Sequence, residues 1–181
     1  MSTAANSAID IVSRALVLIG AEPITSFTEN RTEALVANNM YEDAIRTALS
    51  TARWRFATQQ ATLAQLASDP TGRFDAAHQL PSDLLVLHAV TVNDNLLNYT
   101  VYGDKVFSNA TDTDVVIADY TFRQTETNFP SYFTLAVEYS LASIFATAIA
   151  RSTTLTQLMT AKADQMMAKA RNLDAQQQTT R

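Results

Sequence analysis

Arg53, Trp54, Arg55 and Phe56 alternate basic and aromatic side chains, and they include the only tryptophan of the chain. Such alternation is typical of surfaces that stack nucleotide bases on aromatic rings and hold phosphates with cations. A platform of this kind needs more basic and aromatic residues close by, but the next twenty residues supply one arginine against two aspartates. Alternatively, both aromatic rings pack at the buried end of a helix while the arginines reach solvent. The sequence favours packing and leaves nucleic-acid binding as the alternative.

The other residues that could do chemistry do not have the spacing of a catalytic or metal site. His78 and His88 are ten residues apart with a proline between them, which does not match a helical or hairpin metal pair. Asp112, Thr113 and Asp114 resemble the start of a calcium loop, but the glycine and distal glutamate are absent, so we predict a turn. The chain has no cysteine and only three glycines, which excludes thiolate chemistry and a glycine-rich phosphate loop. We therefore expect no enzymatic activity, no cofactor and no metal.

The composition indicates a globular protein with an uneven charge distribution. The chain has 181 residues, of which 47% are hydrophobic and 17% charged, and its net charge is −5. This balance argues against a general affinity for phosphate backbones. Residues 62–130 hold nine acidic and three basic side chains, so nearly all the acidity lies in the middle. No leader segment is expected at the start, and the longest apolar run, Leu141–Ala150, is about half of what a bilayer requires. We expect a soluble protein that does not associate with a membrane.

Hydrophobic periodicity and turn residues predict helices on both sides of a β-rich segment. The expected helices cover 7–19, 32–54, 131–149 and 154–173, and the expected strands cover 84–92, 96–102, 105–107 and 115–122. The fold class is therefore α+β, mainly α: a four-helix bundle with a small antiparallel β-meander inserted between helices two and three. The expected divisions are 1–61 for helices one and two, 62–130 for the inserted β-rich domain, 131–173 for helices three and four, and 174–181 for a polar tail.

Short motifs occur in a characteristic order over residues 8–172. The first helix ends as AL-x-x-IG-x-x-PI over 15–24, and the alanine-rich second helix ends in Trp54-Arg55-Phe56-Ala57. The later motifs are LP-x-D-x-L over 80–85, Ala118-Asp119-Tyr120, Phe129-Pro130-x-x-Phe133 and Leu141-Ala142. In this order and spacing, the chain resembles the tail tubular protein A family, the head–tail adaptor or connector of short-tailed bacteriophages.

The resemblance implies a structural virion protein at the head–tail interface, made in the host cytoplasm. Such a protein forms a homo-oligomeric ring of twelve copies that binds the portal protein above and the tail nozzle protein below, and in some members tail fibres dock at its edge. Double-stranded DNA passes through the ring during ejection without specific binding. The family has no catalytic residues to transfer. The alternative is a non-viral helical scaffold or regulatory interaction module.

Three groups of residues are candidates for these contacts. An acidic channel wall would let DNA slide. A basic wall would attract each phosphate, and the summed attraction would stall the DNA. The candidate channel-facing or nozzle-facing acids are Asp94, Asp104, Asp112, Asp114 and Asp119. The candidate portal-docking residues, in a locally basic C-terminal stretch, are Lys162, Lys169, Arg171 and Arg181. Trp54 and Phe56 are the candidates for packing at the helix end.

Overall fold

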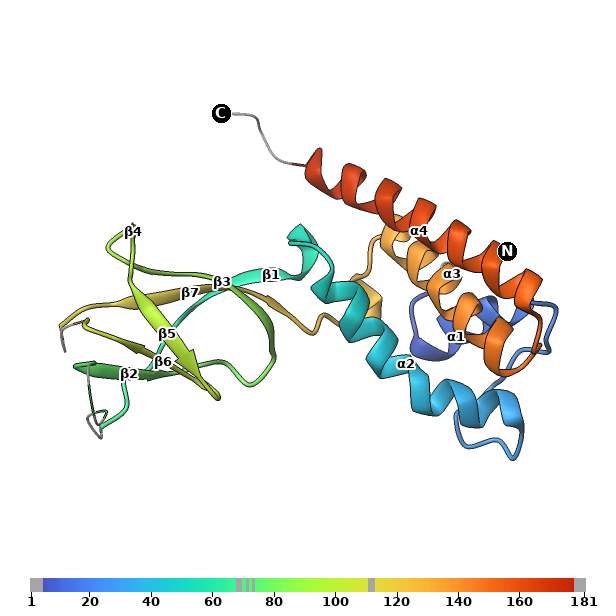
Figure 1. Cartoon of the computed structure of the whole chain (residues 1–181), viewed down its shortest axis with the longest axis horizontal. Helices are drawn as coiled ribbons and strands as arrows, with labels where there is room; N and C mark the ends of the chain where they lie inside the picture. The colour runs from blue at the N-terminus through green and yellow to red at the C-terminus, as the bar shows by residue number, and fades with distance from the viewer. Residues whose placement is uncertain (1–4, 68–69, 71, 73, 111–112, 178–181) are drawn as a thin grey trace. The chain divides into compact units, whose positions relative to one another are not determined.

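The computed structural model describes residues 5–67, 70, 72, 74–110 and 113–177, and the chain divides into two compact units. The helical unit contains the chain up to Phe56 and again from Gln124 onward, and the β unit covers Ala57–Arg123. Figure 1 shows the helices of the first unit and the strands of the second. The β unit is thus an insertion between two halves of the helical unit.

The helical unit contains four α-helices, and local signals set their ends. The helices are α1 (Ala8–Leu18), α2 (Thr32–Ser50), α3 (Ser131–Ala148) and α4 (Thr153–Ala175). The Ser7 hydroxyl accepts a hydrogen bond from the Asp10 backbone N–H at 3.1 Å and caps α1, as Ser152 caps α4 through Leu155 at 3.3 Å. Gly20, with φ of +76°, takes the left-handed conformation that ends α1.

The four helices do not form the four-helix bundle that the sequence predicted. In such a bundle each helix shares one core with two neighbours, whereas here α1, α2 and α4 all pack against α3 (Figure 1). The side chains of Phe133, Leu141 and Phe145 on α3 are all fully buried. By contrast, α4 buries little more than a narrow stripe that includes Met159 and Ala163. Because only α3 is apolar round most of its circumference, it becomes the centre and α4 covers one side of it.

The predicted antiparallel β-meander between helices two and three is present, and in the described residues its strands belong to two antiparallel sheets. The strands are β1 (Thr58–Thr62), β2 (Ala76–Gln79), β3 (Leu84–Val92), β4 (Asn95–Leu96), β5 (Tyr99–Tyr102), β6 (Lys105–Ser108) and β7 (Val116–Phe122). One sheet has the order β1-β7-β3-β4 and the other the order β2-β6-β5. The predicted strand over 96–102 is interrupted at Leu97 and Asn98, where the chain passes from one sheet to the other.

A common core joins the two sheets. Val90 of β3 and Ala118 of β7 pack in one buried cluster with Val106 of β6. β3 also shifts register against β7 at two points, Leu84/Val86 and Leu87/Ala89, which locally increases the twist of the strands. The inserted segment therefore has an apolar interior of its own, distinct from that of the helical unit.

His78 is a buried polar residue in the β unit. It lies on β2 and is 1% exposed, and its Nδ1 atom has no hydrogen-bond partner among the described residues. Burial lowers the pKa of His78 below its usual value of 6.5, because the charged imidazolium would lose its hydration. Burial in the β unit therefore favours the neutral form of His78 at neutral pH.

We expect the thermal stability of the chain to fall as the pH is lowered from about 7.5 to about 5.5. The unfolded chain binds a proton near the ordinary pKa of 6.5, whereas folded His78 binds one only at lower pH. Stability is therefore lost as the pH drops below that value toward the folded pKa. Calorimetric melting at the two pH values measures this, and His78→Leu should reduce the difference. An unchanged difference in that variant would contradict the assignment to His78.

No helix in the described part of the chain is both long enough and apolar enough to cross a membrane.

Candidate functional site

Trp54 lies in a buried aromatic cluster of the helical unit. Its side chain is fully buried, and its Nε1–H donates to the Ala48 carbonyl at 2.9 Å. Its ring centroid lies 5.0 Å from that of Phe133 and 5.9 Å from that of half-buried Phe56. Phe129 joins the same cluster, 6.1 Å from Phe56. Because its ring faces are covered, Trp54 cannot stack on a nucleotide base.

A buried carboxylate fixes the C-terminal end of α4. Asp174 is 3% exposed and accepts hydrogen bonds from the Arg55 backbone N–H and the Tyr132 hydroxyl, both at 2.9 Å. Burial and the neighbouring Asp174 raise the pKa of Tyr132 to about 12, so this hydroxyl remains a donor. Asp174 thereby ties α4 to Arg55, two positions before the β unit begins, and to the start of α3.

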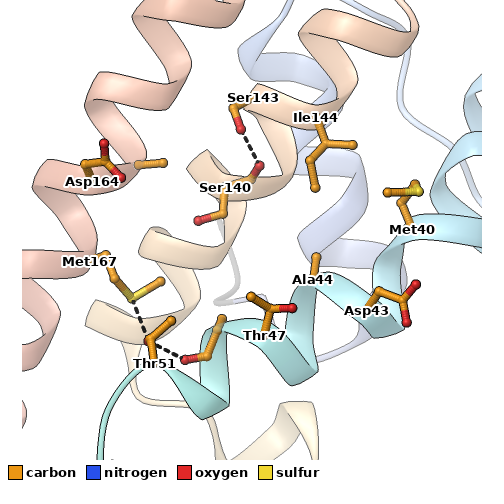
Figure 2. A pocket seen from close by; sticks show the side chains of 12 residues that line it. Met40, Asp43, Ala44, Thr47, Thr51, Ser140, Ser143, Ile144, Asp164 and Met167 are labelled. Carbon is orange, nitrogen blue, oxygen red and sulfur yellow. Dashed lines mark hydrogen bonds between the residues drawn. The ribbon is translucent and has the colours of Figure 1, made fainter.

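A groove runs between α2 and α4, and α3 forms its floor (Figure 2). Its volume is about 400 Å³. The lining side chains are mostly small, and all come from these three helices: Met40, Asp43, Ala44, Thr47, Ala48, Thr51, Ser140, Ser143, Ile144, Ala163, Asp164 and Met167. Figure 2 shows Asp43 of α2 and Asp164 of α4 on opposite sides of the groove. The groove therefore has an acid on each wall.

The polar side chains of the groove floor bond to their own helices. Ser143 Oγ donates to the Ser140 carbonyl at 2.8 Å (Figure 2). Ser140 Oγ donates to the Ala136 carbonyl at 2.9 Å. At the end of α2, the Thr51 hydroxyl lies 2.7 Å from the Ala48 carbonyl and 3.9 Å from the Met167 Sδ atom of the facing α4 wall (Figure 2). Because these hydroxyls already donate to nearby acceptors, the groove presents mainly methyl and methylene groups between the two carboxylates.

An ion pair occupies the opposite side of α3. Glu138 is 6% exposed, and its Oε1 atom lies 3.8 Å from the Arg14 guanidinium of α1. Burial raises the pKa of Glu138, and Arg14 partly offsets this effect. At 3.6 residues per turn, Ser140 on the groove floor lies about 200° round the helix from Glu138. The groove and the α1 side of the unit therefore face in different directions from α3.

Next to this ion pair, α1 presents an exposed surface, which we call the α1 face: Arg14, Val17 and Leu18. The Arg14 side chain is 42% exposed and Val17 is 59% exposed. These two residues are three positions apart, so they lie on one side of the helix. A hollow of about 370 Å³ adjoins the face, bounded also by Ser13, Pro23 and Glu138. The α1 face combines an exposed cation with an exposed aliphatic side chain.

The predicted channel-facing acids are dispersed over the β unit. Asp94 lies in the turn between β3 and β4 with φ of +63°, and Asp104 lies in the turn between β5 and β6. The Gln79 amide donates to the Asp104 carboxylate at 2.9 Å and lowers its pKa. Asp114 and Asp119 are half-buried, the latter within β7, while Asp112 lies outside the described residues. Among the described residues, no three acids or histidines are grouped closely enough to hold a metal ion.

The predicted portal-docking residues lie on α4. Lys162, Lys169 and Arg171 are exposed, and Arg181 lies outside the described residues. Lys162 and Lys169 are seven positions apart, which places them on one side of the helix two turns from each other. Asp174 anchors the C-terminal end of α4, the helix that carries these basic residues.

No protein-family model matches the chain, and no curated protein matches it.

Proposed function

We propose that the chain is the subunit of a head–tail adaptor ring of a short-tailed bacteriophage. In this role its copies pack side by side between the portal and the tail nozzle and enclose part of the DNA ejection channel. The observation that carries the proposal is the groove between α2 and α4, which has small side chains and acidic walls. The assignment to a bacteriophage rests on the order of sequence motifs, which resembles that of the tail tubular protein A family.

A ring needs two different contact surfaces on each subunit, since every copy must bind one neighbour with each. The two surfaces that we propose are the groove on one side of α3 and the α1 face on another. The occupant that we propose for the groove is a helix of a second copy. A cation on that helix would lie between Asp43 and Asp164 and gain from both charges.

The remaining contacts follow from the distribution of charge. The acidic surplus of residues 62–130 suits a wall past which DNA moves without binding. We propose Asp94, Asp104, Asp114 and Asp119 as members of that wall or of the nozzle contact. The exposed Lys162, Lys169 and Arg171 of α4 are the proposed contact with an acidic portal surface.

The chain is expected to form rings on the portal protein encoded in the same genome. Mixing the two purified proteins and imaging them by electron microscopy tests this expectation directly. The supporting result is an added layer of density with the rotational symmetry of the portal. If the chain remains a monomer or dimer by mass and adds no layer, the adaptor proposal fails and the alternative of a helical scaffold or regulatory module gains. A genome without a portal gene would also contradict it.

A further inference from the structure

The groove and the α1 face have complementary chemistry. The groove offers small side chains and two carboxylates, Asp43 and Asp164, from facing walls. The α1 face offers the Arg14 guanidinium and the 59% exposed Val17, one helical turn apart. Cations and carboxylates that meet across an interface select partners and orient them. An aliphatic side chain of the size of valine can enter between alanine and serine side chains.

We propose that the α1 face of one copy docks into the α2–α4 groove of the next copy. Arg14 then lies between Asp43 and Asp164, and Val17 contacts the floor formed by α3. The proposal rests on the copy-to-copy association in the proposed function and specifies its two surfaces. The contact is head-to-tail, because each copy contributes its α1 face to one neighbour and its groove to the other.

The existing partner of Arg14 agrees with this role. Glu138 is buried and lies 3.8 Å from the guanidinium, so it restrains the arginine without covering it. The Arg14 side chain is 42% exposed, so a second copy can reach the guanidinium while it remains near Glu138. Restraining a long side chain before docking reduces the entropy lost on binding. Glu138 thus acts as a positioning residue for Arg14.

The first test compares Val17→Glu with Val17→Lys. These variants place opposite charges at one exposed position, so their effects on folding are closely matched. We expect Val17→Glu to weaken association at least about tenfold, because its carboxylate meets Asp43 and Asp164, and Val17→Lys to weaken it much less. Sedimentation velocity measures association of the free chain, and electron microscopy measures rings on the portal. Equal effects of the two variants would overturn the proposal. The penalty of Val17→Glu should shrink in an Asp43→Asn, Asp164→Asn background, which removes the facing carboxylates without placing a cation beside Arg14; an undiminished penalty would contradict the proposal.

The second test uses the absence of cysteine from the chain. A Val17→Cys copy mixed with a Thr47→Cys copy should form a disulfide-linked dimer under mild oxidation, since docking brings the two positions near the Cα separation of about 6 Å that a disulfide needs. Asn38→Cys, at an exposed position of α2 that does not line the groove, is the matched control and should link far less.

The linking assay separates this proposal from the proposed function. It is run with the chain alone and again with the portal present. A disulfide between the two copies without any binding to the portal supports the interface between the α1 face and the groove, and it overturns the adaptor role. Rings on the portal without linking in either mixture overturn the interface and leave the adaptor role standing. A disulfide between the Thr47→Cys copy and a cysteine of the portal, formed in place of one with the Val17→Cys copy, would assign the groove to the portal. This result would also overturn the interface.

Discussion

Replacing Thr47 with tryptophan is expected to abolish side-by-side association of the chain while leaving its fold intact. Thr47 is exposed on α2 and lines the groove, so an indole at this position fills space that a neighbouring helix would occupy. A well-packed interface loses most of its binding energy when its central contact is blocked. The expected loss in association is at least about a hundredfold, corresponding to about 3 kcal/mol. Sedimentation velocity and ring counts in micrographs measure it.

Asn38→Trp provides the matched control for this prediction. Asn38 is also exposed on α2, but it lies nine positions before Thr47, about 180° round the helix, and does not line the groove. The control adds the same side chain to the same helix and should associate like the natural sequence. Circular dichroism spectra should be the same for both variants. If the two variants associate equally well, the groove is not the contact between copies.

The largest effect on stability is expected from Trp54→Ala. The side chain is fully buried between Phe56 and Phe133, and its removal leaves a cavity in the aromatic cluster. Replacing a buried aromatic side chain with alanine costs about 3–5 kcal/mol, which is a large part of the stability of an ordinary domain. Urea unfolding followed by circular dichroism measures this cost without relying on tryptophan fluorescence.

Trp54→Phe separates packing from hydrogen bonding in the same cluster. Phenylalanine keeps an aromatic ring but lacks the Nε1–H that donates to the Ala48 carbonyl. Loss of one buried hydrogen bond and some volume should cost about 1–2 kcal/mol, less than the alanine variant. If alanine costs no more than phenylalanine, the ring does not anchor the junction between the end of α2 and the start of α3.

The helices could be predicted from the sequence because their signals are local. Ser7 and Gly20 set the limits of α1, and the apolar circumference of α3 indicated a central helix. The prediction of a four-helix bundle was wrong because periodicity shows which side of a helix is apolar. It does not show how many neighbouring helices pack against that side. α4 has too narrow a buried stripe to complete a bundle.

The two sheets were harder to predict than the helices. β1 has the sequence TQQAT and β2 has AAHQ, and neither shows the apolar alternation that identifies a strand. Their places come from pairing with β7 and β6, which are distant in sequence. The sequence therefore predicted the strands that carry most of the apolar residues and missed those that pair with them.

The candidate site depends on contacts that no local pattern contains. The alanine-rich face of α2 indicated a packing surface, but the groove also needs Ser140 and Ser143 of α3 and Ala163 of α4. Asp174 and Glu138 would be read as ordinary surface acids, although both are buried. Residues separated by more than a hundred positions become neighbours only when the helical unit closes around α3.

The order of synthesis gives this arrangement a further consequence. The β unit, Ala57–Arg123, is continuous in the chain, so it can fold as soon as it leaves the ribosome. The groove needs α4, and α4 is held in place by Asp174, which is translated after the β unit and after α1, α2 and α3. A nascent chain that has not yet emerged as far as α4 consequently lacks the groove.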